Sequence, residues 1–199
     1  MAKLKLTKNE LKKQKDGLKR FQRYLPTLML KKQQLQAEIR TVEILLNELE
    51  LQKEKSDADI KKWLAVFSEN GVFTPDILKV TNVQITDGNV AGVAVQVLED
   101  IEFAVAEYNL LDKPLWLDIA VSTMKKDIRL ELELKYMREQ MRRLRNEMQT
   151  TSQRVNLFEK IKIPEAKSNI KKIGVYLGDQ QTAAVVRGKI SKRGMERAN

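Results

Sequence analysis

Two long stretches of the sequence carry apolar residues at alternating spacings of three and four, and no other feature constrains the fold as strongly. In the first stretch these residues are Leu18, Phe21, Leu25, Leu28, Leu35, Ile39, Val42, Leu46 and Leu49, with Lys32 at one inner position. In the second they are Leu130, Leu134, Met137, Met141, Leu144, Met148, Thr151, Val155 and Phe158. Each ladder lasts about four heptads, which is typical of helices that supercoil around a partner.

The nearest available partner of each ladder is the other one. If the chain folds back through the roughly 80 residues between them, the two helices pair in antiparallel fashion. Pairing Leu49 with Leu130 makes the numbers of facing residues add up to about 179, so that Leu18 faces Ile161 and Trp63 faces Trp116. We therefore predict a mainly α fold: a long antiparallel two-helix coiled coil with a small antiparallel β-sheet or hairpin head between the helices.

Between the ladders the apolar residues alternate with polar ones, which is the period of a strand. Thr86-Asp87-Gly88-Asn89 separates two such runs, and Asp-Gly readily takes the positive φ of a hairpin turn. The second run is interrupted at Glu99-Asp100. We predict two or three antiparallel strands with the turn at Asp87-Gly88.

Local signals set the expected helix ends. Thr7 with Glu10 three residues later forms a capping box, and Asn70-Gly71 provides a stop. Pro26 lies inside the first helix, where the continuous heptad phase favours a kink over a break. Pro164 marks a second kink or joint, after a returning helix that runs from about Pro114 to Ile161.

The expected organisation has four parts: a long N-terminal helix in 1–70, the hairpin head in 71–113, a long C-terminal helix in 114–163, and a terminal helix with a basic tail in 164–199. Gly174, Gly178 and Gly188 weaken the helicity of the last part. We expect its ordering to depend on a partner.

The net charge of +10 is concentrated at the two ends of the sequence. Residues 1–23 hold nine Lys or Arg against two acidic residues, and residues 187–199 hold five against one. These segments carry +7 and +4, which leaves −1 for the rest of the chain. In an antiparallel pair both ends lie at one tip, so the partner surface there should be acidic or polyanionic.

The composition excludes several classes of function. There is no cysteine and no histidine, so disulfides, thiolate metal sites and the commonest general base are all absent. The sequence has neither an apolar run of membrane-spanning length nor the apolar core of a signal peptide, and we expect a cytoplasmic protein. No phosphate-binding glycine loop occurs, so we predict neither catalysis nor a cofactor or metal site. The cluster Arg138, Arg142, Arg143 and Arg145 is interpreted as a solvated face, or alternatively as a contact for an acidic partner.

Several segments resemble one protein family. Arg154-Val155-Asn156-Leu157-Phe158-Glu159, followed by Ile163-Pro164, is similar to the C-terminal signature of the D subunit of the V-type (vacuolar or archaeal type) ATPase. Leu6-Thr7-Lys8-Asn9 and the segment from Leu28 to Leu35 resemble its N-terminal signature. Tyr24-Leu25-Pro26-Thr27-Leu28 and Lys113-Pro114-Leu115-Trp116 are similar to bacterial members. The resemblance covers nearly the whole chain, with the motifs in matching order and spacing.

The resemblance implies a central rotor shaft that holds no nucleotide. In that family the coiled coil enters the catalytic hexamer of A and B subunits with its termini foremost. The other end binds the F subunit and stands on the C (or d) subunit, which caps the membrane ring. The implied protein is a non-catalytic part of an ion-pumping complex on the cytoplasmic side of the membrane, without direct membrane insertion and without nucleic acid.

A basic tip that turns past acidic walls provides long-range contacts that tolerate sliding. On this ground we hypothesise that Lys8, Lys12, Lys13, Arg187, Lys189 and Arg193 contact the hexamer. Arg154, in the C-terminal signature, is expected further along, at the mouth of the cavity.

Two other interpretations stay open for the sequence alone. A basic coiled coil could bind anionic membranes, which predicts positive charge along one flank. It could also bind nucleic acid through the basic tip, which predicts binding that falls steeply with salt.

Overall fold

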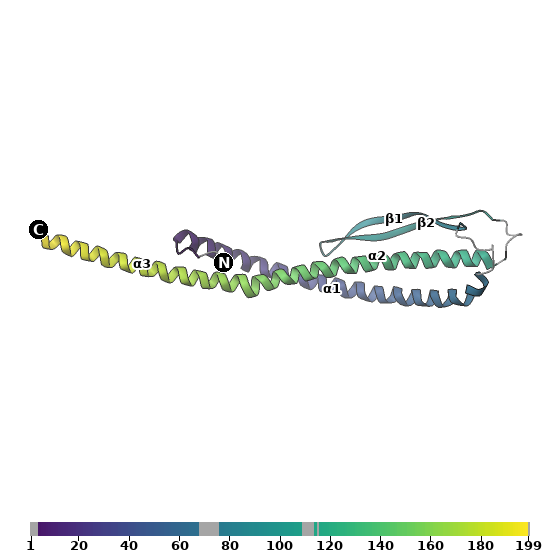
Figure 1. Ribbon diagram of the computed structural model, residues 1–199, viewed down its shortest axis with the longest axis horizontal. Coiled ribbons are helices and arrows are strands. Elements are labelled where there is room, and N and C mark those ends of the chain that lie inside the picture. The colour runs from purple at the N-terminus through teal and green to yellow at the C-terminus, as the bar shows by residue number, and fades with distance from the viewer. Residues whose placement is uncertain (1–3, 68–75, 109–113, 115, 199) are drawn as a thin grey trace. The chain divides into compact units, whose positions relative to one another are not determined.

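The computed structural model describes residues 4–67, 76–108, 114 and 116–198, and for 63–67 and 196–198 it describes the backbone only. The element order is α1 (Lys8–Phe67), β1 (Leu78–Val90), β2 (Val93–Val105), α2 (Trp116–Asn156), the π-helix η1 (Leu157–Lys162) and α3 (Ile163–Ala198). Figure 1 shows these elements. The predicted fold class is confirmed: long helices dominate, and one two-stranded antiparallel sheet lies between them in sequence.

The chain divides into two compact units. Unit 1 consists of Met1–Lys32 and Thr150–Asn199, and unit 2 consists of Gln33–Gln149. The division falls inside α1 and inside α2, so each unit contains a part of both helices.

In unit 2 the predicted ladders form the core. Leu35, Val42, Met141 and Leu144 make one buried cluster, so α1 and α2 meet where the heptad pattern places their inner faces. The hairpin turn also packs there, because Val90, Ala91 and Val93 contact this cluster. The other end of the hairpin packs on a second cluster of Ile77, Leu117 and Val121. The hairpin therefore runs along α2, as Figure 1 shows.

The predicted turn at Asp87-Gly88 is wrong. Both residues lie within β1, and the chain turns at Ala91-Gly92, where φ is 51° and 78°. Positive φ at both central residues is the requirement of a two-residue type I′ hairpin. The Asn89 side-chain oxygen accepts a hydrogen bond from the Gly92 N–H at 2.9 Å and supports the turn. Packing of the turn on the helix cluster explains why the locally favoured Asp-Gly is not used.

The interruption predicted at Glu99-Asp100 is a bulge rather than a strand end. Gln84 pairs with Asp100 while Ile85 pairs with Leu98, so Glu99 is an extra residue in β2. A second irregularity lies between Val80 and Asn82 in β1. The sheet accordingly has two strands, the lower of the two predicted numbers.

In unit 1, α1 begins as predicted, because the Thr7 hydroxyl oxygen accepts a hydrogen bond from the Glu10 N–H at 3.2 Å. The helix continues through Pro26 without a non-helical segment. The rings of Phe21 and Phe158 lie 5.1 Å apart, and their numbers sum to the predicted 179. The predicted pairing of Trp63 with Trp116 lies outside the described residues.

Just before Pro164, where a kink or joint was predicted, unit 1 contains a π-helical turn that joins α2 to α3 without a non-helical residue. In this turn, η1, the Ile163 N–H donates to the Phe158 carbonyl five residues earlier. Beyond it, α3 is helical across Gly174, Gly178 and Gly188 as far as Ala198. Its last fully buried side chain is Ile173, and every described side chain from 184 to 195 is exposed.

Candidate partner-binding surface

All seven residues predicted to contact a partner lie in unit 1, and all have exposed side chains. Lys8, Lys12 and Lys13 lie in the first two turns of α1, and Arg154 lies in the last turn of α2. Arg187, Lys189 and Arg193 lie on the exposed part of α3. Exposure leaves each of them available to a partner.

The structure brings the α1 lysines together with cations that the sequence pattern did not single out. Lys12 and Lys13 line one shallow groove with Arg20. Lys13 and Arg20 also line a second groove, on the other side of which lie Lys162 of η1 and Asn169 of α3. Arg20 and Lys162 therefore line the same groove, where Lys162 also forms an ion pair with Glu165 at 3.4 Å. Arg20 was already counted in the basic segment 1–23, whereas the position of Lys162 depends on how η1 and α3 pack against α1.

The tail cations lie further along α3. Leu4 and Leu6, just before α1, line a small apolar hollow with Lys171, Lys172 and Val175. Arg187 follows Val175 by twelve residues, or about 18 Å of helix. Arg187, Lys189 and Arg193 are therefore not gathered beside Lys8, Lys12 and Lys13.

Arg154 lies on the other side of the Phe21–Phe158 ring pair from Lys13. Taking the facing rings of Phe21 and Phe158 as the reference, Lys13 is eight residues away on one side and Arg154 is four residues away on the other. Their levels along the helices differ by about 18 Å. The predicted residues are thus spread along unit 1 in three groups.

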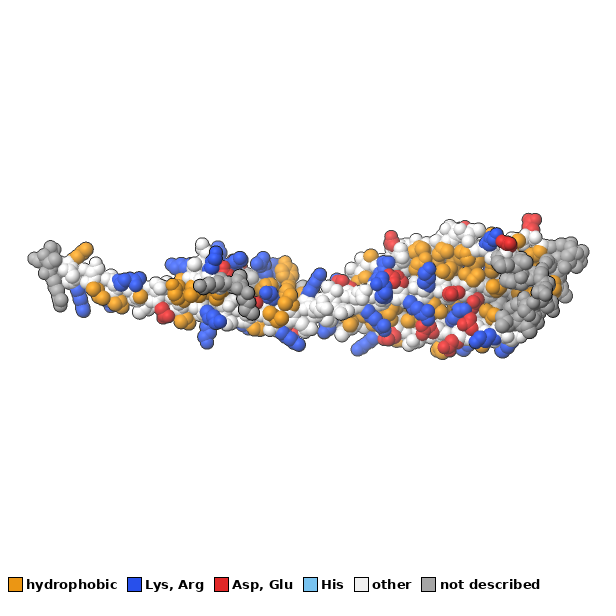
Figure 2. Space-filling view, viewed as in Figure 1, with side chains coloured by type: hydrophobic (Ala, Val, Ile, Leu, Met, Phe, Trp, Pro, Cys, Tyr) orange, Lys and Arg blue, Asp and Glu red, His pale blue; other side chains and the backbone are white. Residues whose placement is uncertain are grey.

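The two units differ in charge much more than the ends of the sequence alone indicated. Unit 1 contains 22 Lys or Arg against six Asp or Glu, a net charge of +16, whereas unit 2 contains 15 against 21, a net charge of −6. On the face shown in Figure 2, basic and acidic side chains alternate over unit 2, while basic ones prevail over unit 1. The acidic residues of unit 1 are too few to balance its cations.

In unit 2 the arginine cluster of α2 is largely occupied by internal ion pairs. Arg138 reaches Glu50 of α1 at 2.8 Å, and Arg145 reaches Glu43 at 3.3 Å. These pairs tie α2 to α1 and favour a structural interpretation of the cluster over a contact with an acidic partner.

The remaining two arginines of the cluster share one carboxylate. Glu139 accepts hydrogen bonds from Arg142 at 2.6 Å and from Arg143 at 2.9 Å. Hydrogen bonds from Arg142 and Arg143, and then their positive charges, lower the pKa of Glu139 to about 2. Arg143 also donates to the Ala94 carbonyl at 3.2 Å, which links α2 to the hairpin.

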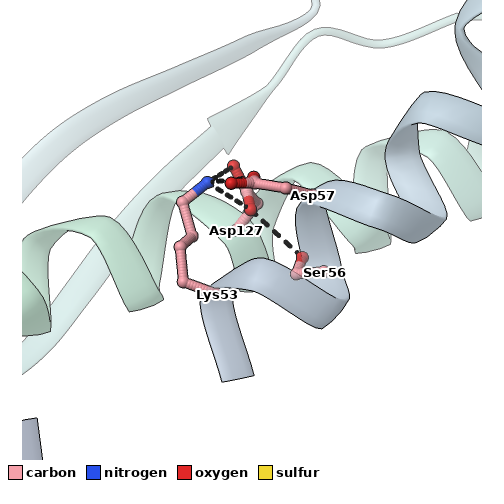
Figure 3. A network of polar contacts seen from close by, with 4 residues as sticks. All are labelled: Lys53, Ser56, Asp57 and Asp127. Carbon is pink, nitrogen blue, oxygen red and sulfur yellow. Dashed lines mark hydrogen bonds and ion pairs between the residues drawn. The ribbon is translucent and has the colours of Figure 1, made fainter. Parts of the chain in front are cut away.

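A polar contact that the sequence analysis missed lies between the helices of unit 2 (Figure 3). The Lys53 ammonium lies 2.7 and 2.8 Å from the two carboxylate oxygens of Asp127 and 2.6 Å from Asp57. The Ser56 hydroxyl donates to Asp127 at 3.1 Å. The signal was present: Lys53 and Asp127 occupy the next ladder positions beyond Leu49 and Leu130, and their numbers sum to 180.

This contact is only slightly open to water, since the Lys53 and Asp127 side chains are 21% and 18% exposed. Partial burial by itself lowers the pKa of Lys53. The hydrogen bonds to Asp127 and Asp57, together with their negative charges, outweigh it and raise the pKa. Lys53 therefore stays charged and binds two carboxylates across the seam.

Among the residues that the structure describes, no group of three or more acidic side chains is arranged to hold a metal ion. None of the helices in the described ranges combines the length and the apolar character needed to cross a membrane.

The sequence matches known proteins over its whole length. A family model described as the D subunit of ATP synthase matches residues 10–193. The V-type ATP synthase D subunit of Borreliella burgdorferi is 49% identical over 199 residues, which cover 100% of this chain and 98% of that protein. The V-type ATP synthase D subunit of Chlamydia pneumoniae is 35% identical, covering 97% and 93%, and that of Chlamydia trachomatis is 33% identical, covering 96% of each.

Proposed function

Since the chain belongs to the family of ATP synthase D subunits, we propose that it is the central rotor shaft of a V-type ATP synthase. In this role it transmits torque between a catalytic hexamer of A and B subunits and the membrane ring that translocates ions. The chain itself holds no nucleotide and catalyses no reaction. It works on the cytoplasmic side of the membrane as a peripheral part of the complex.

The proposed partners bind different parts of the chain. The A/B hexamer surrounds the basic surface of unit 1, including Lys8, Lys12, Lys13, Arg154, Arg187, Lys189 and Arg193. The F subunit and the C (or d) subunit that caps the ring bind away from the chain termini.

The helix pairing supports a role in transmitting torque. A twist applied to one helix of a pair is resisted by the side chains that interlock across the seam. In unit 2 the seam is reinforced by ion pairs that join α1 to α2, such as Lys53–Asp127 and Glu50–Arg138. A single helix would lack this resistance.

The observation that carries the proposal for the hexamer contact is the +16 charge of unit 1. A rotor must turn past several similar sites without stopping at any of them. Electrostatic attraction varies slowly over a Debye length of about 8 Å, so it can hold a rotor and still let it turn. Interlocking apolar contacts would anchor it at one angle.

The test is charge reversal on the full-length chain. One variant combines Lys8→Glu, Lys12→Glu and Lys13→Glu, and a second combines Arg187→Glu, Lys189→Glu and Arg193→Glu. We expect each to lower the affinity for the purified A/B hexamer by about tenfold or more. The stimulation of ATP hydrolysis by the chain should fall in parallel. Wild-type affinity should also fall as the salt concentration rises.

The matched control changes the net charge by the same amount in unit 2. It combines Lys55→Glu, Lys61→Glu and Lys126→Glu, three lysines outside the basic surface. We expect its hexamer affinity to stay within about threefold of the wild type. Equal losses for control and test variants would contradict a specific basic surface. Binding of DNA but not of the hexamer, steeply dependent on salt, would favour a nucleic-acid function instead.

A further inference from the structure

The apolar ladder of the returning chain changes phase by one residue at η1. Before η1 the buried positions follow alternating steps of three and four: Leu134, Met141, Leu144, Thr151 and Val155 are all at most 5% exposed. Continued beyond Phe158, the same steps lead to positions 162, 165, 169, 172 and 176. The buried side chains of α3 are instead Ala166, at 4%, and Ile173, at 0%.

The positions expected from an unbroken ladder are more open to solvent. Lys172 is exposed and Tyr176 is 40% exposed, whereas Ile173 beside Lys172 is fully buried. Moving the ladder by one residue, to 166, 170, 173 and 177, accounts for the buried positions of α3. One extra residue must therefore be accommodated between Phe158 and Ala166.

The π-helix accommodates it. A π turn closes its hydrogen bond over five residues rather than four, so it takes up one residue more than an α turn. Here the Ile163 N–H donates to the Phe158 carbonyl, which is a five-residue step. On α1 the facing ladder runs on through Gln14, Leu18, Phe21 and Leu25 with no such change, since all four are half-buried.

We propose that η1 is a one-residue phase insertion required by the seam, which keeps α2 and α3 on the same face of α1. The competing cause is Pro164, which lacks an N–H and crowds the carbonyl of Lys160 four residues earlier. Proline accounts for a disturbance near this point but not for the direction and size of the phase change. The number of residues between Phe158 and Ala166 accounts for both.

We expect the helix to open more readily at the insertion than in the regular turns beside it. π turns are rare, and they concentrate at functional positions. Phe158, whose ring packs on Phe21, fixes the seam at the start of the insertion. Backbone opening in unit 1 is therefore expected between Phe158 and Ala166 rather than at the ring pair.

The test is a set of single-residue deletions in the full-length chain. Deletion of Lys160, an exposed residue of η1, lets the helix become regular with every seam residue in place, so Tm should stay within about 2 °C of wild type. Deletion of Gln153, an exposed residue of α2, moves Val155 and Phe158 off the seam. Losing an aromatic and an aliphatic contact should lower Tm by about 10 °C or prevent folding. Lys160→Ala controls for the lost charge.

Hydrogen exchange of residues 157–163 provides the second readout. In the wild type these amides should exchange faster than those of the preceding turns of α2, and deletion of Lys160 should abolish the difference. Pro164→Ala should leave it in place, because the phase mismatch persists without the proline. Loss of the fast exchange in Pro164→Ala, or a Lys160 deletion as damaging as that of Gln153, would overturn the proposal.

Discussion

In unit 2, α1 and α2 are joined by an apolar cluster, by ion pairs across the seam and by a hairpin that packs on both clusters of buried residues. In unit 1, the helices meet along a seam with the Phe21–Phe158 ring pair, on a surface with fewer than one carboxylate for every three cations. Unit 2 thus pairs cations and carboxylates across its helices, whereas the cations of unit 1 far outnumber its carboxylates. The difference predicts that unit 2 is the more stable part and that the stability of unit 1 depends more strongly on salt.

The comparison can be tested most strongly with two buried residues of similar size. Leu144 in unit 2 and Ile173 in unit 1 are both 0% exposed. Leu144→Ala should cost about 4 kcal/mol, because Leu35, Val42 and the hairpin turn surround the cavity and cannot all collapse into it. Ile173→Ala should cost about 2 kcal/mol, since α3 has exposed side chains beyond it and can shift. Urea unfolding followed by circular dichroism measures both, and a larger loss for Ile173→Ala would reverse the ranking of the units.

A smaller effect is expected at the polar contact of unit 2. Lys53→Met leaves Asp127 partly buried without its ion partner and should cost about 2 kcal/mol. The double change Lys53→Leu and Asp127→Leu should restore stability to within about 1 kcal/mol of wild type or exceed it, because it extends the apolar ladder. If the double variant lost as much stability as Lys53→Met, the ion pair itself would stabilise the fold, beyond keeping each buried charge compensated.

The same pair predicts a pH dependence. Folding raises the pKa of Lys53. The contribution of Lys53 to the free energy of unfolding is therefore fully present below the unfolded-state pKa of about 10.4. It is lost as the pH rises through the folded-state pKa. Subtracting the alkaline unfolding curve of Lys53→Met from that of the wild type isolates this residue. A difference between the two that is constant up to high pH would contradict the assignment.

The smallest effect concerns Glu139, which lies on the surface with Arg142 and Arg143. Its carboxyl should titrate with a pKa of about 2 in the folded chain, and a ¹³C-detected NMR titration would measure this value. Because folding lowers the pKa of Glu139, the contribution of this residue to the free energy of unfolding is present above the unfolded-state pKa of about 4.3. It is lost as the pH falls toward 2. Glu139→Gln should change Tm by only about 1 °C, as exposed pairs usually do. An ordinary glutamate pKa would show that the two arginine contacts do not persist in solution.

Features that repeat along the chain could be predicted from the sequence alone. Heptad spacing predicted both ladders and their antiparallel pairing, because a seam of many residues tolerates few alternative alignments. It also predicted the register as far as Phe21 and Phe158, but beyond them it placed Leu18 against Ile161, which is 53% exposed. Thr7 and Glu10 predicted the start of α1, because the hydrogen bond between them lies within one turn and depends on no distant residue.

Features that depend on a single tertiary contact were harder to predict from the sequence. Asp87-Gly88 is the stronger local turn signal, yet the hairpin turns at Ala91-Gly92, where Val90 and Val93 reach the helix cluster. The spread of the basic residues follows in part from the register, which leaves the residues after about 175, with the basic tail, without a partner on the first helix. How far apart the groups lie depends on α3 continuing as a helix. The phase change at η1 was visible in the positions of Ala166 and Ile173, but burial was needed to tell it from an ordinary amphipathic pattern.

The division of the chain inside α1 and α2 has a consequence for how unit 1 assembles. Its two segments, 1–32 and 150–199, are held near each other by the 117 residues of unit 2. Their pairing is thus an intramolecular association, with an effective concentration set by that tether rather than by the amount of protein in solution. Cut free, the two peptides would each expose new helix ends with four unsatisfied backbone groups and would have to meet against their mutual positive charge. Folding of unit 2 is therefore what concentrates two like-charged segments enough to pair.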